Sequence, residues 1–357
     1  MHNRFLIFLI IILCPIISKA QGIPASSRDS TEKDFNFVPV PYINYSRSLG
    51  FAGGLIPMAM YKINKSDTIS PASITGLMGM YTSNDTWFGM FFHRMYLKED
   101  NWRITTAGGL ASVNFQFYLD LPIAGGGFVD YNTQADFFFI EAQRRVHGKL
   151  YLGLNYTYTY FNTVFGEDNV IDPEPVTLHG LGVKGSWDRR DDVYYPKSGS
   201  MIEVDWKSYP GFLDNEFESN KIEMSFNYFF PARENNDVIA ARLKTGLGVG
   251  DLTFEQQFIV GREDIRGYTQ GQFRGNYLMA FQGEYRWNFH KKLSAVGFFG
   301  VASVFDSINE EDEGKLLPGI GTGFRFNVFP KYHMNVGMDI AAGKDDWGIY
   351  FRVGEAF

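Results

Sequence analysis

The sequence predicts an all-β protein, a transmembrane antiparallel β-barrel of about 16 strands, an even number as bacterial barrels require. The first supporting observation is alternation, because segments of about ten residues carry apolar side chains at every second position. The second is composition, since aromatic residues make up 17% of the 357-residue chain and glycines number 38. The third is that no later stretch is long and apolar enough for a membrane helix. A secreted β-sandwich or β-propeller is the alternative.

The amino terminus has the pattern of an export signal. A positive charge at Arg4 precedes an apolar run over residues 5–17, and the small residue Ala20 follows. We expect residues 1–20 to be a cleaved signal peptide, since the apolar run is too short to span a bilayer. Residues 21–36 are polar, and we expect them to form a short periplasmic segment before a barrel over residues 37–357.

The composition of the expected mature chain excludes several kinds of site and partner. Cys14 is the only cysteine and lies within the signal, so the mature chain offers no disulfide and no thiolate metal site. The signal also holds Arg4 and Lys19 and no acid, which leaves 31 basic against 40 acidic residues. This negative balance argues against nucleic acid as a partner.

Charged side chains recur on one face of several expected strands. In the strand expected over residues 277–289, Phe281 and Trp287 share one face, whereas Glu284 and Arg286 share the other. Such charges would be costly facing lipid, but they are ordinary where they line a wet lumen. A soluble sandwich with so many aromatic strands would expose large apolar patches. The expected strands are 41–45, 51–63, 72–82, 87–98, 102–119, 134–146, 151–160, 176–188, 201–209, 221–230, 238–250, 277–289, 293–305, 319–328, 334–342 and 347–357.

The connections alternate between tight turns and long segments, as expected for short periplasmic turns and long outer loops. Two long segments are a glycine-rich loop over residues 122–132 and an acidic loop over residues 166–175. The longest, residues 253–276, is the sixth outer loop by this count. It carries three arginines, among them Arg266, which need carboxylates or water around them. A long loop inside a compact protein is usually functional.

The second half of the chain carries a series of motifs that resemble one known family. Ile265-Arg266-Gly267-Tyr268 is similar to a Val-Arg-Gly-Phe/Tyr motif in a long sixth outer loop, and Phe357 to a terminal sorting residue. From residue 180 onward the chain resembles the BamA/TamA superfamily of outer-membrane barrels, also called the bacterial surface antigen family. The other motifs that carry the resemblance are the strand end and turn with Asp188, Arg190, Pro196 and Gly199, and the strand segments 283–286, 319–325 and 338–341.

The resemblance implies that the long loop folds inward into the lumen, where Arg266 pairs with carboxylates of the inner wall. Glu284 and Asp339 are the candidate partners, because both are predicted to face the lumen. A guanidinium suits this role because it stays charged and offers a bidentate fork. The alternative is a solvated loop arginine without a fixed contact.

The resemblance also implies a seam between the first and last strands that opens sideways to lipid. Pro39 and Pro41 fit an edge strand, because proline donates no ladder hydrogen bond. Gly348 and Gly354 would weaken the partner strand. The alternative is that these prolines and glycines are simply the residues that commonly occur at strand ends. Glu355 departs from a terminal sorting pattern, which has an apolar residue at that position.

These expectations indicate an outer-membrane barrel for protein insertion or translocation, or for lipid handling. Its expected partners are outer-membrane lipids, unfolded outer-membrane or exported proteins, and a separate periplasmic protein. The periplasmic protein is expected because family assembly factors carry POTRA domains at the position that residues 21–36 occupy here. The alternative function is a passive channel or structural barrel that the loop plugs. No two of the six histidines lie at metal-ligand spacing and no strand provides a Ser–His pair, so we expect no catalytic residues, no metal and no cofactor.

Overall fold

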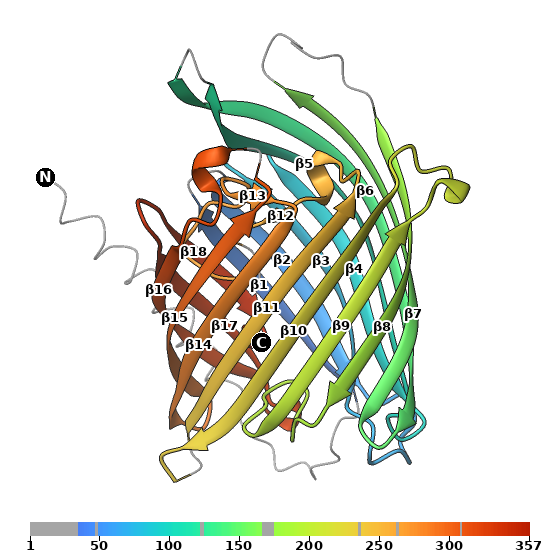
Figure 1. The fold of residues 1–357 in the computed structure, drawn as a ribbon. Coiled ribbons are helices and arrows are strands. Elements are labelled where there is room, and N and C mark those ends of the chain that lie inside the picture. The colour runs from blue at the N-terminus through green and yellow to red at the C-terminus, as the bar shows by residue number, and fades with distance from the viewer. Residues whose placement is uncertain are drawn as a thin grey trace, which may run out of the picture. The chain divides into compact units, whose positions relative to one another are not determined.

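The computed structural model describes residues 35–46, 49–121, 125–165, 175–234, 237–261, 264–307 and 309–357. Within these ranges, 16 strands form one closed barrel, and two short strands form a separate sheet (Figure 1). The predicted signal peptide and nearly all of the predicted periplasmic segment lie outside the described residues. Among the residues that the structure describes, no helix is long and apolar enough to cross a membrane.

Each barrel strand pairs antiparallel with its neighbours in the chain, and the ring closes where β1 pairs with β18. The separate sheet consists of β12 (Phe258–Ile259) and β13 (Arg274–Gly275), which belong to the segment connecting β11 with β14. The barrel strands are β1 (Phe35–Ser46), β2 (Gly50–Tyr61), β3 (Ser73–Thr82), β4 (Trp87–Leu97), β5 (Trp102–Leu121), β6 (Gly125–His147), β7 (Leu150–Phe165), β8 (Val176–Asp188), β9 (Gly199–Tyr209), β10 (Ser219–Ala232), β11 (Asp237–Gly250), β14 (Tyr277–His290), β15 (Leu293–Phe305), β16 (Leu317–Phe329), β17 (Met334–Ala342) and β18 (Trp347–Val353).

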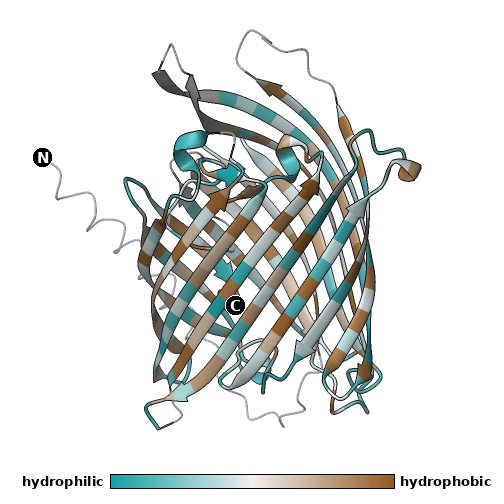
Figure 2. Cartoon of the chain, in the orientation of Figure 1, coloured by the Kyte–Doolittle hydropathy of each residue, from teal (hydrophilic) through white to brown (hydrophobic). Residues whose placement is uncertain are grey.

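The outside of the barrel is apolar and the inside is mixed, because side chains of a strand alternate between its two faces. On β14, Phe281 and Trp287 are 40% and 48% exposed. Glu284 and Arg286, on the opposite face of the same strand, are buried. The bands of apolar and polar residues that alternate along the strands are visible in Figure 2. An apolar exterior around an interior that holds the charged side chains is the arrangement of a barrel that faces lipid.

The predicted strands agree with the structure over most of the chain, and the prediction of about 16 barrel strands is confirmed. The expected strands 176–188, 293–305 and 334–342 have the same bounds as β8, β15 and β17. The prediction of a loop over residues 122–132 is wrong, because β6 begins at Gly125 and its ladder with β5 starts at Leu121↔Gly125. Glycine lacks the side chain from which alternation is recognised, but its backbone still pairs.

The barrel also begins two residues earlier than predicted. β1 starts at Phe35, and both Phe35 and Phe37 are exposed on the outer face with Ile43. The apolar alternation therefore continues through Pro39 and Pro41, which interrupt it in the sequence but not in the pairing with β2.

The junction between β1 and β18 has the shortest backbone ladder among the barrel strands of the structure. Tyr45 pairs with Ile349, and the next residue pair completes the ladder, whereas β1 pairs with β2 along its whole length. Where the ladder ends, the rings of Tyr42 and Phe351 meet at 5.4 Å between centroids. We call this junction the seam.

We predict that a cysteine pair at Tyr45→Cys and Ile349→Cys forms a disulfide in the folded barrel, because directly opposed residues of two strands have the Cβ separation that a disulfide needs. The measurement is gel mobility of the unheated and heated protein after mild oxidation, in a chain that also carries Cys14→Ser.

The matched control is the pair Val38→Cys and Ala356→Cys. A straight continuation of the seam register would place these two residues opposite each other. In the structure the main-chain oxygen of Ala356 instead accepts a hydrogen bond from Arg242 at 3.4 Å. We expect no disulfide from this pair, and its formation would show that β18 continues beyond Val353.

Candidate functional site

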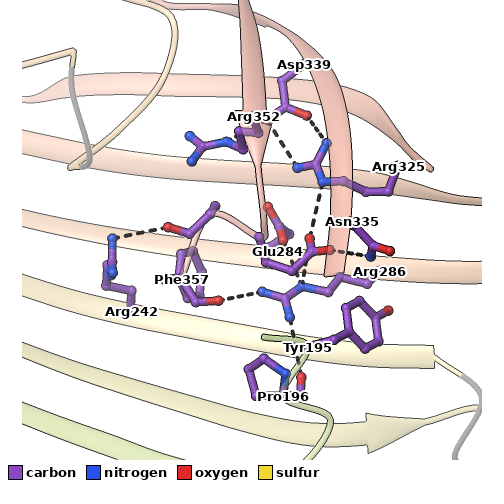
Figure 3. A network of polar contacts seen from close by, with 12 residues as sticks. Tyr195, Pro196, Arg242, Glu284, Arg286, Arg325, Asn335, Asp339, Arg352 and Phe357 are labelled. Carbon is purple, nitrogen blue, oxygen red and sulfur yellow. Dashed lines mark hydrogen bonds and ion pairs between the residues drawn. The ribbon is translucent and has the colours of Figure 1, made fainter. Parts of the chain in front are cut away.

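A buried cluster of charged side chains joins the inner faces of β14, β16, β17 and β18. Its seven members, which we call the ion-pair cluster, are four arginines and three carboxylates linked by direct ion pairs. The members that belong to strands point into the barrel because side chains alternate along a strand, and the exposed apolar residues occupy the opposite, outer face. Figure 3 shows most of the network. The members are Arg266, Glu284, Arg286, Arg325, Asp339, Arg352 and Glu355.

Arg266 bridges two strands through the two ends of its guanidinium group. Its Nη1 lies 2.6 Å from Oδ2 of Asp339 on β17, and its Nη2 lies 3.0 Å from Oε2 of Glu284 on β14. The guanidinium carbon lies 3.3 Å from the ring centroid of Phe298, and Arg266 is only 2% exposed. These are the two carboxylates proposed from the sequence. A planar fork reaches both at once, which a lysine ammonium would not.

The neighbours of Arg266 in its motif pack tightly against the barrel wall. Ile265 and Tyr268 belong to a buried apolar cluster that includes Leu278 of β14 and Leu317 of β16. Gly267 has φ +112°, and a Cβ at this position would lie 2.6 Å from the carbonyl carbon of Ala342. Position 267 therefore requires glycine for two independent reasons, its backbone conformation and its close approach to the wall.

The motif is also hydrogen-bonded to the last strand and to the segment before it. The amide of Gly267 donates to the hydroxyl of Tyr350 on β18 at 2.9 Å. The Tyr268 hydroxyl donates to the carbonyl of Pro318 at 2.7 Å and accepts from the amide of Lys344 at 3.0 Å. The motif thus contacts one of the two strands that form the seam.

The segment between β11 and β14 has ordered structure of its own around Arg274. The guanidinium of Arg274 lies 3.5 Å from the ring centroid of Phe254, and its Nη1 donates to the Phe254 carbonyl at 3.0 Å. Thr253 and Gln256 form a capping box at the start of the segment. Arg262, the remaining arginine predicted in this loop, lies outside the described residues.

Three further arginines complete the ion-pair cluster, and sequence reasoning did not assign them to it. Arg286 donates through Nε to Glu284 at 2.9 Å. Arg325 contacts both Asp339 and Glu355, and Arg352 lies 3.1 Å from Asp339. The available signal was that each of them falls on the inward-facing side of its strand, β14, β16 or β18. This alternation does not give the register between strands that brings them together.

The tail after β18 enters the lumen, so the expectation of a strand over 347–357 is wrong for its last four residues. Gly354 has φ +83°, which turns the chain away from the seam. The Glu355 carboxylate is then held 3.2 Å from Nε of Arg325 and 2.7 Å from Nδ2 of Asn335. The charge of Glu355, unusual for a terminal sorting pattern, is therefore paired within the ion-pair cluster.

Phe357, predicted as a sorting residue, lies against the same cluster. Its main-chain oxygen accepts a hydrogen bond from Nη2 of Arg286 at 2.8 Å (Figure 3). The guanidinium of Arg242 lies 5.0 Å from the centroid of its ring. The sorting role of Phe357 remains a prediction.

The predicted strand-turn motif forms a second, smaller group of charges. Asp188, at the end of β8, accepts from Nε and Nη2 of Arg190 at 2.9 Å each, and from Nη1 of Arg103 at 2.7 Å. Gly199 has φ +100°, as a turn into β9 requires. The carbonyl of Pro196 accepts from Nη1 of Arg286 at 3.4 Å, so this turn is connected to the ion-pair cluster.

The balance of charge in the cluster predicts an order of severity for substitutions. Arg266→Ala leaves three guanidinium groups with three carboxylates, so we expect the barrel to insert and the loop to become sensitive to protease. Asp339→Asn leaves four guanidinium groups with two carboxylates, and we expect the free energy of unfolding to fall by about 3–5 kcal/mol.

The measurements for this prediction are limited proteolysis of the folded barrel and unfolding by denaturant. Lys207→Ala, which removes a lumen cation whose ion pair is with Asp205, is the control and should change neither. Protease resistance unchanged by Arg266→Ala would show that the two ion pairs of Arg266 do not hold the loop.

Comparisons with known proteins agree with this architecture. A model of the Omp85 superfamily domain matches residues 77–357. A search of curated proteins returned no match.

Three solved structures are similar to this chain in fold. CdiB from Escherichia coli has a TM-score of 0.61 and 12% identity, covering 90% of this chain and 62% of that chain. BamA from Haemophilus ducreyi lacking POTRA domains 1–3 has a TM-score of 0.59 and 12% identity, covering 90% and 70%. CdiB from Acinetobacter baumannii has a TM-score of 0.57 and 13% identity, covering 90% and 60%. The chain thus spans less than two thirds of either CdiB chain. The resemblance predicted from the motifs is confirmed, and the chain belongs to the Omp85 superfamily.

Proposed function

We propose that this barrel inserts or translocates proteins at the bacterial outer membrane, with the seam between β1 and β18 as the place where a client strand enters the wall. Membership of the Omp85 superfamily supports the general role. The observation that carries the specific proposal is the short ladder at the seam, which leaves most of β1 without a backbone partner on that side.

An unpaired strand edge favours strand addition. A row of free amide and carbonyl groups is a template for another extended chain. In β1 the residues before Tyr45 present this edge toward β18, while Phe351 and Val353 of β18 pack against the apolar side chains next to it. A client strand would replace these side-chain contacts with ladder hydrogen bonds.

The ion-pair cluster is proposed to set the position of β18 relative to β1. Asp339 binds Arg266 of the loop and Arg352 of β18 at the same time. Tyr350 of β18 accepts from the amide of Gly267 at 2.9 Å. Because loop and last strand share these partners, movement of one changes the contacts of the other.

The proposal requires no catalysis by the protein, and no cofactor. Its partners are proposed to be outer-membrane lipids, unfolded outer-membrane or exported proteins as clients, and a separate periplasmic protein that delivers them. The site of action is proposed to be the outer membrane, after cleavage of residues 1–20.

The test is quantitative proteomics of outer membranes from cells whose only copy carries the Tyr45→Cys and Ile349→Cys pair. Under oxidising growth the seam is fixed by a disulfide, and we expect a selective, several-fold fall in other barrel or surface-exposed proteins. Reductant should restore them, because the same barrel then has a free seam.

The matched control is Val183→Cys with Trp206→Cys, a directly opposed and exposed pair on β8 and β9. This disulfide should leave the proteome unchanged, because it lies away from the seam. If neither the seam disulfide nor deletion of the protein alters the proteome, the insertion role is wrong, and a plugged channel becomes the better account.

A further inference from the structure

A cavity of about 520 Å³ lies inside the barrel beside the seam. Tyr42 of β1 and Phe351 of β18, the two rings that meet across the seam, both line it. Its other walls come from β2 to β5, from the turn after β8 and from the tail after Val353. The volume is within the range of pockets that hold one small organic ligand.

Apart from His93 and Arg94 of β4, the wall that β2, β3 and β4 give to this cavity is apolar. Ile56, Ile74, Met78 and Phe92 line it, and Met334 of β17 lies nearby in the same lining. On the opposite side of the lumen, the inner faces of β8 to β11 instead carry ion pairs such as Lys184–Glu203 and Lys244–Glu223. Apolar surface left against water costs about 25 cal/mol per Å², so an apolar ligand would be stabilised on this wall only.

One cation on this wall makes no direct hydrogen bond or ion pair within the described part of the chain. Arg94 of β4 is paired in register with Ile74, so its side chain shares the inner face, and it is exposed while lining the cavity. The hydroxyls of Tyr96 and Tyr194 and the carboxylates of Glu203 and Glu141 act on its guanidinium electrostatically, but among the described residues none lies at hydrogen-bond or ion-pair distance. Arg190, the other arginine of the lining, is held by Asp188 at 2.9 Å.

The remaining charges of the lining are already satisfied. Glu355 lies between Arg325 and Arg286, at 3.2 and 3.7 Å. A ligand therefore meets an apolar wall, one guanidinium without a direct ion pair, His93 and the hydroxyl of Thr105. Thr105 is paired with Arg94 in register.

We propose that this cavity binds an anionic amphiphile with a single acyl chain, such as a fatty acid or a lysophospholipid. The acyl chain would lie along Ile56, Met78 and Phe92, and the carboxylate or phosphate would accept hydrogen bonds from Arg94, whose planar guanidinium suits either head. Access from the membrane runs through the seam, where side chains rather than ladder bonds separate cavity and lipid. This site goes beyond the proposed function and does not depend on it.

The test is native mass spectrometry of the full chain in neutral detergent, with three probes titrated separately. Palmitate tests a free carboxylate, lysophosphatidylglycerol tests a phosphate headgroup, and hexadecanol tests the acyl chain without charge. We expect one molecule of an anionic probe per barrel, bound at least about tenfold more tightly than hexadecanol, which corresponds to one charge-assisted hydrogen-bonded pair. The anionic probe that binds more tightly shows whether the site prefers a free carboxylate or a phosphate headgroup.

Four variants test the assignment of residues. Arg94→Gln should weaken the anionic probes about tenfold and leave hexadecanol unchanged, whereas Arg94→Lys should retain most of the binding. Met78→Trp should weaken all three probes by filling the cavity. Lys207→Gln, a lumen cation outside the cavity lining, should bind like the unmodified chain. Heat-dependent gel mobility checks that each variant is folded.

Two results would overturn the proposal. One is the absence of stoichiometric binding of either anionic probe to the unmodified chain. The other is equal binding by Arg94→Gln and Lys207→Gln, which would show that the amphiphile binds elsewhere in the detergent-solubilised barrel.

Discussion

The structure depends on one buried arginine that reaches two carboxylates from two different strands. Arg266 would be costly to bury without partners, and Glu284 and Asp339 would be equally costly without cations. Their pairing at 3.0 and 2.6 Å gives each of the three groups an oppositely charged partner, while Nε of Arg266 is buried without a hydrogen bond. The cost of breaking such a pair is larger than the net gain of forming it, so the interaction specifies one position for the loop motif more than it adds stability.

The same constraint extends to the second half of β18 and to the tail that follows it. Arg352 and Tyr350 connect the strand itself to Asp339 and Gly267, and Glu355 connects the tail to Arg325. The tail is thereby kept inside the lumen, where it does not continue the ladder with β1. The ladder with β1 ends at Ile349, whereas β18 continues against β17 to Val353, so the seam is already short before the tail turns inward at Gly354.

Much of the fold could be predicted from the sequence because alternation is a local property of each strand. The bounds of β8, β15 and β17 and the inward direction of Glu284 and Asp339 follow from it. Arg325, Arg352 and Glu355 were missed because their association depends on register across four strands, which no local pattern contains. The glycine-rich start of β6 was missed for a related reason, since its backbone pairs where its side chains give no signal.

Through Arg266, the loop motif and the last strand share one set of buried contacts. This coupling can be measured by hydrogen–deuterium exchange of the β18 amides in the unmodified barrel and in Arg266→Ala, with β8 and β9 as internal reference. In Arg266→Ala we expect faster exchange in Trp347–Val353 and in the loop segment, and no change in the reference strands. Equal exchange of β18 in both proteins would show that the last strand is held independently of the loop, and that Arg266 does not couple them.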